Sequence, residues 1–408
     1  MVLLKENILR SEVDKMTVSD SVKYIGVDDT DIDLFESQYL VPDGVSYNSY
    51  VILDDKIAVM DTVDERKTEE WFNNLTEVLG DRQPDYLVIS HLEPDHASNI
   101  ERLAARYPDM KLVGNAKTFQ MLPQFFDLDF SGRSVVVKEG EELSLGTHKL
   151  IFYMAPMVHW PEVMVTYEAT EKILFSADGF GKFGAIELTK DKDWACEARR
   201  YYFNIVGKYG GPVQQLLKKA AGLDIDMICP LHGPVLKDNL GYYIGLYDTW
   251  SKYEPENRGV LIAYASIHGN TAKAAKELAD MLKEAGEEKI VVSDLSRDDM
   301  AEVIEDAFRY DRMIFCAASY DGGVFPCMQD FLLHLQSKAY QNRTVGMVEN
   351  GSWAPCAARV MRSIVDTFKN VTVIDPVVTI KSTVKESDKA ALSSLAQAIY
   401  EAADKTVE

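Results

Sequence analysis

The chain is poor in cysteine and has no long apolar run, and each shortage excludes a class of protein. Its 408 residues include 5 Cys, and no two of them form a CxxC pair, so neither a rubredoxin-type iron site nor a zinc knuckle is present. Scattered cysteines in an odd number are typical of reduced thiols, which favours a cytoplasmic location. No apolar run is long enough for a membrane span, and the residues from Lys5 on have no signal-peptide pattern.

Basic residues are also in short supply. The 43 Lys and Arg stand against 65 Asp and Glu, which gives a formal net charge of -22. No positive excess is available to neutralise phosphates, so the composition argues against a nucleic-acid partner and against an anionic membrane surface. A hydrophobic content of 47% and a charged content of 26% are ordinary for globular proteins. A chain of 408 residues is too long for one core, which predicts at least two domains.

The first part of the chain mixes paired strands with helices. Apolar runs at 50–53 and 57–61 are separated by a short turn and predict two adjacent strands. Helical patterns follow at 65–79 and, after several more strands, at 194–206. This order fits a sandwich of two sheets with helices on both outer sides, an αββα arrangement.

A change of pattern predicts the domain boundary. The polar, proline-containing stretch 251–258 follows a long helical pattern, so we predict domains at 1–254 and 255–408. Beyond it, strands and helices alternate strictly through five units, starting with a strand at 259–265. Such alternation predicts a doubly wound parallel sheet, and the fold class is therefore α/β.

One short stretch concentrates metal-binding chemistry. His91-Leu92-Glu93-Pro94-Asp95-His96 follows the apolar run 86–89 and contains two of the chain's 7 His. His91, Glu93 and Asp95 alternate, so an extended backbone would send all three to one side, and a helix beginning near His96 would return it to the group. A solvated turn with Asp95 as helix N-cap explains neither histidine. A metal site explains both.

Three further candidate ligands each follow an apolar strand. They are His159, Asp178 and His232, and each taken singly also fits an ordinary turn or loop end. Together with the first stretch they suit two metals that share one bridge. We expect one metal at His91, Glu93 and His159, the other at Asp95, His96 and His232, and Asp178 between them. Imidazole with carboxylate oxygen suits iron or manganese as well as zinc.

At this point the sequence resembles known families. The first part looks like the metallo-β-lactamase fold, whose zinc hydrolases carry HxHxDH, whereas HLEPDH has Glu93 at the second histidine. With the later ligands, this substitution resembles the flavodiiron proteins, and the resemblance covers nearly the whole chain, including 44–50 and 199–205. It implies that the seven named residues hold two non-haem iron ions. Tyr201 or Tyr202 either lines the pocket or packs between helices.

The second part carries a phosphate-binding pattern in its first βα turn. Backbone N–H groups at a helix start, with hydroxyls and a glycine, are suited to a phosphate. The loop resembles that of flavodoxins, which bind FMN, and implies cofactor roles for Ser266, Ile267, His268, Gly269, Asn270 and Thr271.

Two later loops have the composition that a flavin ring needs. Their residues are Ser319, Tyr320, Asp321, Gly322 and Gly323, and Asn350, Gly351, Ser352 and Trp353. Tyr320 and Trp353 are candidates for stacking on the ring, although Trp353 also suits a subunit interface. Cys327 and Cys356 lie just past these loops, and we expect both to be packing residues.

The resemblance implies an oxidoreductase that reduces dioxygen to water or nitric oxide to nitrous oxide. Two ferrous ions and one reduced flavin hold the four electrons that dioxygen requires. The family brings flavin and metals together in a head-to-tail homodimer, which can pair further into a dimer of dimers. No nicotinamide fingerprint is present, so the implied electron donor is external, such as rubredoxin or a reduced deazaflavin.

Two other functions fit parts of the pattern. A dinuclear zinc hydrolase fused to a flavodoxin would need an acidic zinc-bound water, and the carboxylate of Glu93 makes that water less acidic. A non-enzymatic electron carrier with a vestigial metal site would have lost ligands, whereas this set is complete.

Overall fold

The computed structural model describes Met16 and residues 18–403, and the N-terminal segment that contains Lys5 lies outside the described residues. The chain divides into two compact units: unit 1 comprises Met1–Tyr202 and Gly211–Tyr247, and unit 2 comprises Phe203–Gly210 and Asp248–Glu408. The domain boundary after residue 254 stays a prediction. In the described part of the chain, no helix has both the length and the apolar character that a bilayer crossing requires.

Unit 1 is built on two sheets that face each other. The first sheet has the order β1 (Val22–Tyr24), β6 (Tyr50–Ile52), β7 (Ala58–Met60), β8 (Tyr86–Val88), β9 (Lys111–Asn115) and β10 (Ser134–Val137). The second has the order β11 (Glu142–Ser144), β12 (Lys149–Met154), β13 (Met164–Glu168), β14 (Ile173–Phe175) and β15 (Met227–Cys229). Buried side chains of both sheets, among them Val88, Phe152 and Phe175, form one hydrophobic core.

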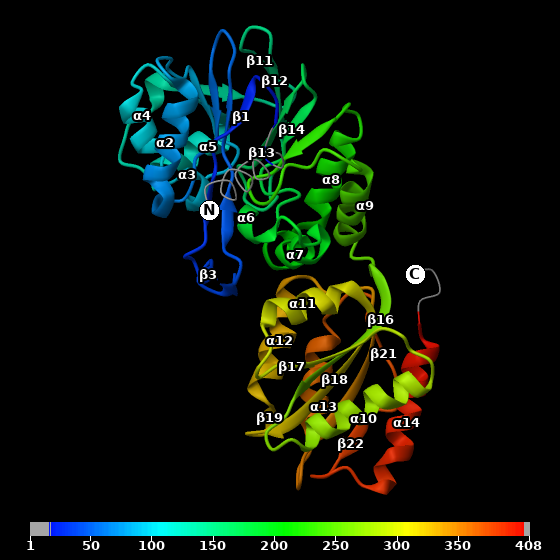
Figure 1. The fold of residues 1–408 in the computed structure, drawn as a ribbon. Helices are drawn as coiled ribbons and strands as arrows, with labels where there is room; N and C mark the ends of the chain where they lie inside the picture. Colours follow the sequence, from blue (N-terminus) through cyan, green and yellow to red (C-terminus); the bar gives the residue numbers. More distant parts are fainter. Residues whose placement is uncertain (1–15, 17, 404–408) are drawn as a thin grey trace, which may run out of the picture. The chain divides into compact units, whose positions relative to one another are not determined.

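Helices cover the outer sides of this sandwich (Figure 1). Beside the first sheet lie α2 (Thr68–Leu79), α4 (Ile100–Arg106) and α5 (Ala116–Met121). On the other side of unit 1 lie α6 (Ile186–Thr189), α7 (Trp194–Tyr201), α8 (Gly210–Ala220) and α9 (Leu240–Ser251). Apolar side chains at helical spacing on α2, such as Trp71 and Leu75, are buried. The predicted αββα sandwich is confirmed.

Two local features of unit 1 differ from the expectation. No strand is predicted before residue 50, but residues 22–47 contain β1 and two small sheets. These sheets pair β2 (Val27–Asp29) with β5 (Val45–Tyr47) and β3 (Leu34–Phe35) with β4 (Tyr39–Leu40). Strands of two or three residues are too short to show a period. The expected extended backbone through Asp95 is wrong, because α3 (Pro94–Ala97) already begins at Pro94. Proline at the first helical position is set up for a helix start.

Unit 2 contains a parallel sheet with the order β17 (Ile290–Asp294), β16 (Asn257–Ala265), β18 (Tyr310–Tyr320), β20 (Thr344–Asn350) and β21 (Thr372–Val373). In chain order this is 2-1-3-4-5, the order of flavodoxin-like sheets. The sequence predicts the fifth strand at 371–374, whereas β21 spans only Thr372–Val373, and β22 (Val378–Ile380) continues the pairing with β20. The short β19 (Gly323–Val324) pairs antiparallel with β18. The loops after β16 and β18 leave the same edge, where the strand order reverses.

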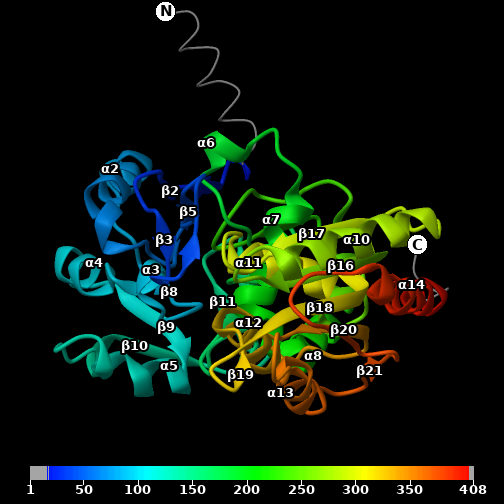
Figure 2. The same ribbon diagram turned by 90° about the horizontal axis from the view of Figure 1, so that it is seen from below.

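Helices cover both faces of this sheet. On one face α10 (Asn270–Glu284) and α14 (Glu386–Glu401) lie side by side in both views (Figures 1 and 2). The other face carries α11 (Met300–Arg309), α12 (Pro326–Ser337) and α13 (Ala357–Val365). Ile262 and Ile314 of the sheet pack with Leu278 of α10 and Leu395 of α14 in the core. The predicted doubly wound sheet is confirmed.

Candidate metal centre and cofactor cavity

The predicted metal ligands come from strand ends at one end of the unit 1 sandwich. His91 follows β8, His159 lies between β12 and β13, Asp178 follows β14 and His232 follows β15. Because β13 runs antiparallel to β14 and β15 runs parallel to it, these loops of the second sheet meet at the same edge. The fold therefore brings together residues that are far apart in the sequence, since 141 positions separate His91 from His232.

The structure brings the predicted ligands into two adjacent groups. Within each group the donor atoms lie within 4.8 Å of one another. The first group is His91, Glu93, His159 and Asp178, and the second is Asp95, His96 and His232. The six residues other than Asp178 divide into the two sets named in the sequence analysis, and their roles as metal ligands stay a prediction.

Asp178 lies between the two groups. Its Oδ2 is 3.4 Å from Nε2 of His91 and 3.4 Å from Nε2 of His159. Its Oδ1 faces the other group, at 3.5 Å from Nε2 of His96 and 3.8 Å from Nε2 of His232. One carboxylate thus offers an oxygen to each group, which is the geometry of a bridging ligand.

The donor set fits bound cations. Nε2 of His159 lies 3.0 Å from Oε2 of Glu93, yet this nitrogen has no hydrogen-bond partner among the described residues. Both carboxylate oxygens of Asp95 and both of Asp178 are likewise buried without a hydrogen bond from the described residues. Leaving buried carboxylates in this state is costly unless a cation balances them. The lone pairs converge on shared points where metal ions would bind.

Electrostatics keeps the carboxylates ionised. Burial alone would raise the pKa of Glu93, but close contacts with His159 and His91 outweigh burial and lower it. Burial likewise opposes ionisation of Asp178, and contacts with His159 and His96 hold its pKa well below the usual value. Burial lowers the pKa of His159, whereas Asp178 and Glu93 raise it to about 9. The cluster is arranged to hold positive charge next to ionised carboxylates.

A contact that sequence reasoning missed supports His91. Nδ1 of His91 lies 3.0 Å from Oε1 of Glu162, a fully buried residue just before β13. The same oxygen accepts a hydrogen bond from the backbone N–H of Leu92 at 2.9 Å. The available signal was a carboxylate directly before the run Val163-Met164-Val165, three residues after His159.

The two neighbouring tyrosines have different environments. The ring centroid of Tyr201 lies 5.5 Å from that of His232, so Tyr201 packs against the second group. Tyr202 packs instead against Tyr247, with centroids 5.1 Å apart. Of the two alternatives from the sequence, a position beside the metal ligands applies to Tyr201 and helix packing applies to Tyr202.

The predicted flavin loops line a cavity of about 510 Å³ in unit 2, a usual size for a cofactor site. All predicted loop residues except Gly269 and Gly323 line this cavity. Four residues without a predicted cofactor role also line it: Ala318, Ala354, Cys356 and Ser382. Cys356, expected to be a packing residue, also lines the cavity, because the turn from β20 to α13 carries it there.

The cavity is suited to a phosphate and a ring. Gly269 is the N-cap of α10 with φ +86°, and no side chain caps this helix start, so its first N–H groups are available to an anion. The hydroxyl of Ser266 accepts the backbone N–H of Gly269 at 3.1 Å. Two aromatic wall residues are accessible, with Tyr320 44% exposed and Trp353 92% exposed. The cavity thus offers backbone N–H groups that can bind a phosphate and aromatic rings that can stack on a flavin.

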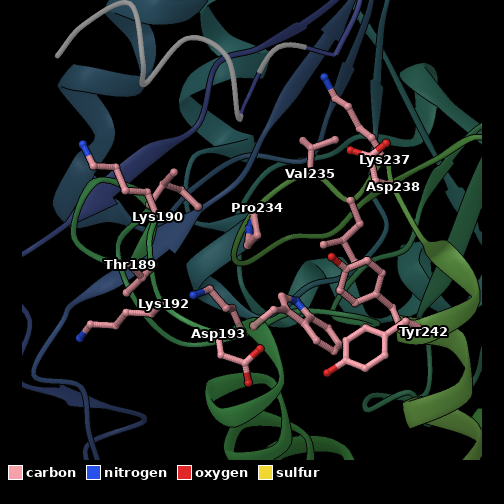
Figure 3. Close-up of a pocket in the computed structure, with 14 residues that line it drawn as sticks. Thr189, Lys190, Lys192, Asp193, Pro234, Val235, Lys237, Asp238 and Tyr242 are labelled. Carbon is pink, nitrogen blue, oxygen red and sulfur yellow. The ribbon is translucent and has the colours of Figure 1, made fainter. Parts of the chain in front are cut away.

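Unit 1 also has a cavity, of about 400 Å³, and none of the candidate metal ligands lines it (Figure 3). Its walls carry Lys182, Lys190, Lys192 and Lys237 beside Trp194, Tyr242 and Tyr243. Lys192 pairs with Asp43 at 2.5 Å. This basic, aromatic hollow is separate from the metal-binding groups.

Comparisons with known proteins cover nearly the whole chain. A family model described as ODP family beta lactamase matches residues 45–233. An uncharacterised protein of Methanocaldococcus jannaschii is 27% identical over 367 residues, which are 87% of this chain and 90% of that protein. The anaerobic nitric oxide reductase flavorubredoxin of Escherichia coli is 29% identical over 352 residues, which are 83% of this chain and 72% of that protein.

A solved structure shares the complete two-unit fold. The rubredoxin oxygen:oxidoreductase of the anaerobe Desulfovibrio gigas superposes with a TM-score of 0.87 at 25% sequence identity. The superposition covers 95% of this chain and 98% of that one. The similarity therefore includes both the sandwich of unit 1 and the doubly wound sheet of unit 2.

Proposed function

Because this chain belongs to the flavodiiron proteins and is an oxidoreductase, we propose that it reduces dioxygen to water, nitric oxide to nitrous oxide, or both. The observation that carries the proposal is the pair of donor groups that share Asp178. The flavin-sized cavity in unit 2 supports it. The cofactors of the family are FMN and a non-haem di-iron centre.

The seven donors would hold the iron pair. His91, Glu93 and His159 would bind one ion, the second group would bind the other, and Asp178 would contact both. When bound, the iron pair and reduced FMN supply the electrons for reduction of the gas. The three carboxylates in the set contribute negative charge that stabilises the ions, and the buried imidazoles exclude water from most directions.

The loops of unit 2 would hold FMN. The N–H groups at the start of α10 would bind the phosphate, with help from the hydroxyls of Ser266 and Thr271. Tyr320 and Trp353 would contact the ring system.

Electrons would come from an external donor and pass through FMN to the metals. The relative from Desulfovibrio gigas is named for rubredoxin, which supports rubredoxin as one candidate, and a reduced deazaflavin is another. We further propose a cytoplasmic location and a head-to-tail homodimer, alone or paired as a dimer of dimers, in which each flavin serves the partner's metals.

The decisive experiment measures iron, zinc and FMN per chain in protein purified without air, followed by gas consumption with a chemical reductant. The proposal expects two irons and one FMN, with consumption of dioxygen, nitric oxide or both. Two zincs and ester hydrolysis without reductant would overturn it in favour of a hydrolase. Bound flavin with no metal and no gas consumption would instead indicate an electron carrier.

A further inference from the structure

We propose that Glu162 is the positioning residue that makes the two metal sites unequal, by fixing the tautomer and orientation of His91. The inference rests on the proposed function in one respect only, which is that the two donor groups bind metal ions. It assigns a role to a residue outside the seven donors.

The first step concerns the proton on His91. An ionised carboxylate only accepts hydrogen bonds, so the 3.0 Å contact with Oε1 of Glu162 places the proton of His91 on Nδ1. Nε2 faces Glu93 at 3.1 Å and Asp178 at 3.4 Å, so it is the nitrogen that would bind a metal ion once that ion takes the place of a proton there. Glu162 therefore selects the tautomer that can bind a metal.

The second step concerns rigidity. One oxygen of Glu162 accepts both from the ring of His91 and from the backbone N–H of Leu92, so the ring and the loop that carries it are held together. The backbone of Glu162 is itself fixed, because the side-chain amide of Asn115 donates to its carbonyl oxygen at 2.6 Å. Glu162 leads into β13 and Asn115 ends β9, so these contacts join the two sheets beside the metal ligands.

The third step compares His91 with the two imidazoles of the second group. Nδ1 of His232 lies 2.7 Å from the carbonyl oxygen of Ser46, a neutral acceptor. Nδ1 of His96 is buried and has no hydrogen-bond partner among the described residues. A carboxylate makes an imidazole a stronger metal ligand than a neutral partner does. The ion in the first group is therefore bound more tightly than the ion in the second.

The packing around His91 leaves little freedom for an alternative. Its ring meets the ring of Trp160 edge-to-face, with centroids 5.1 Å apart, and the ring of His159 at 5.2 Å. The His91 ring is fully buried, as is the carboxylate. Loss of the negative charge at position 162 is thus felt at His91 without a rearrangement of the ring.

The test follows the release of metal to a chelator from the full-length, anaerobically iron-loaded protein. We expect two phases in the natural protein. Loss of such a partner usually lowers metal affinity by about tenfold to a hundredfold, so in Glu162→Gln the slow phase should accelerate by a similar factor while the fast phase is unchanged. Glu162→Asp keeps the charge but shortens the side chain, so it should release the same ion at a rate between those of Glu162→Gln and the natural protein.

The matched control is Glu168→Gln at the other end of β13. Glu168 is also fully buried, and its carboxylate accepts hydrogen bonds from the backbone N–H groups of Thr170 and Glu171 at 2.9 and 2.6 Å. It contacts none of the seven candidate metal ligands. Equal release from Glu162→Gln and the natural protein would overturn the inference. So would equal acceleration of both phases, or the same acceleration in Glu168→Gln.

The readout separates this inference from the proposed function. If the natural protein holds zinc rather than iron, the proposed function fails, but the same release assay with zinc still tests Glu162. Should Glu162→Gln fail to fold, Glu162→Asp alone decides: it should release one ion moderately faster than the natural protein, and an unchanged rate contradicts the role.

Discussion

His96 and His232 bring their Nε2 atoms to 3.1 Å although 136 positions separate them in the sequence. The Nδ1 atom of His232 donates to the carbonyl oxygen of Ser46, so Nε2 is the nitrogen that is left to bind a metal ion. Two imidazole nitrogens at this distance are attracted only if a proton or a metal ion lies between or beside them. The fold thus prepares the second donor group before any ion is bound.

Asp178→Asn should remove the shared ligand. A neutral amide replaces the carboxylate that faces both groups, so we expect iron to fall from two per chain to less than one and gas consumption to be lost. FMN should stay at one per chain, because the flavin cavity belongs to unit 2. Elemental analysis and flavin absorbance measure both quantities in one sample.

The control for this substitution is Asp28→Asn, also in unit 1. The Asp28 carboxylate accepts hydrogen bonds from the backbone N–H groups of Ile186 and Glu187 and contacts none of the seven candidate metal ligands. It should lower stability and leave two irons in place. Full iron content in Asp178→Asn would contradict the bridging role.

Gly269→Ala should weaken FMN binding. Alanine at φ +86° costs about 1–2 kcal/mol, and the unbound loop relaxes from this strain whereas the bound loop cannot, so the Kd should rise roughly tenfold. The space around Gly269 is open, so the effect is conformational rather than steric. Flavin fluorescence titration of the deflavinated protein measures the Kd.

Gly80→Ala is the matched control. Gly80 has φ +57° and ψ -122° with open surroundings at the end of α2 in unit 1, so alanine also introduces backbone strain there, far from the flavin loops in sequence. It should lower the free energy of unfolding and leave the Kd for FMN unchanged. An equal rise of the Kd in both variants would show that Gly269 has no specific role.

Much of the fold follows from local patterns, and the candidate site follows from strand ends. Apolar runs such as 86–89 mark buried strands, and the polar residues after them identify His91 and the later donors. The short strands β1 to β5 were not predicted, because two or three residues are too few to show the alternation of apolar and polar side chains that marks a strand. The start of α3 was misplaced because Pro94 can either end a strand or begin a helix.

Contacts that depend on long-range pairing could not be predicted. Glu162 meets His91 because the two sheets pack face to face, and no spacing in the sequence joins positions 71 residues apart. Ser382 reaches the flavin cavity through hydrogen bonds between its backbone and Asn350. Such residues carry ordinary loop or strand identities, and only tertiary structure gives them a role.

Trp353→Ala should reduce FMN affinity with little effect on folding. The side chain is 92% exposed, so its loss should change the free energy of unfolding of the flavin-free protein by less than about 0.5 kcal/mol. Loss of aromatic stacking on the ring should cost about 1 kcal/mol, roughly a fivefold rise in Kd. Isothermal titration with FMN gives the value.

Leu333→Ala controls for the loss of an exposed apolar group in unit 2, because Leu333 on α12 is half exposed and outside the cavity walls. It should leave FMN binding unchanged. If Trp353→Ala instead weakens self-association in analytical ultracentrifugation at constant FMN affinity, Trp353 serves a subunit interface and the stacking role is wrong.

A buried ion cluster around His148 predicts a pH-dependent stability of unit 1. Nδ1 of His148 lies 2.8 Å from Asp54 and Nε2 lies 3.1 Å from Glu171, whose carboxylate also accepts the hydroxyl of Ser21. Burial lowers the pKa of His148, but its hydrogen bonds to Glu171 and Asp54 outweigh burial and raise it. Burial raises the pKa of both carboxylates, whereas backbone N–H groups and His148 lower that of Asp54, and Ser19, Ser21 and His148 lower that of Glu171.

The sign of the effect follows from these directions. A histidine whose pKa is raised on folding adds stability that is complete below its unfolded pKa of about 6.5 and is lost as the pH rises through the folded value. The two carboxylates add stability that is present above about pH 4 and is lost as the pH falls through their folded pKa values. The cluster therefore contributes most between these limits. His148→Gln should destabilise unit 1 near pH 6 and much less near pH 9.

Hydrogen exchange on peptides that cover β11 and β12 measures this locally, because a chain of two units does not unfold in one step. The protection lost on His148→Gln should be larger at pH 6 than at pH 9, once the intrinsic exchange rates are corrected for pH. His334→Gln is the opposite control, because burial lowers the pKa of His334 and its neutral form is the favoured one in the folded chain. Its substitution should cost less near pH 6 than near pH 9. A His148→Gln effect that is equal at both values would mean that His148 is neutral in the folded chain and that the cluster is held by hydrogen bonds without charge.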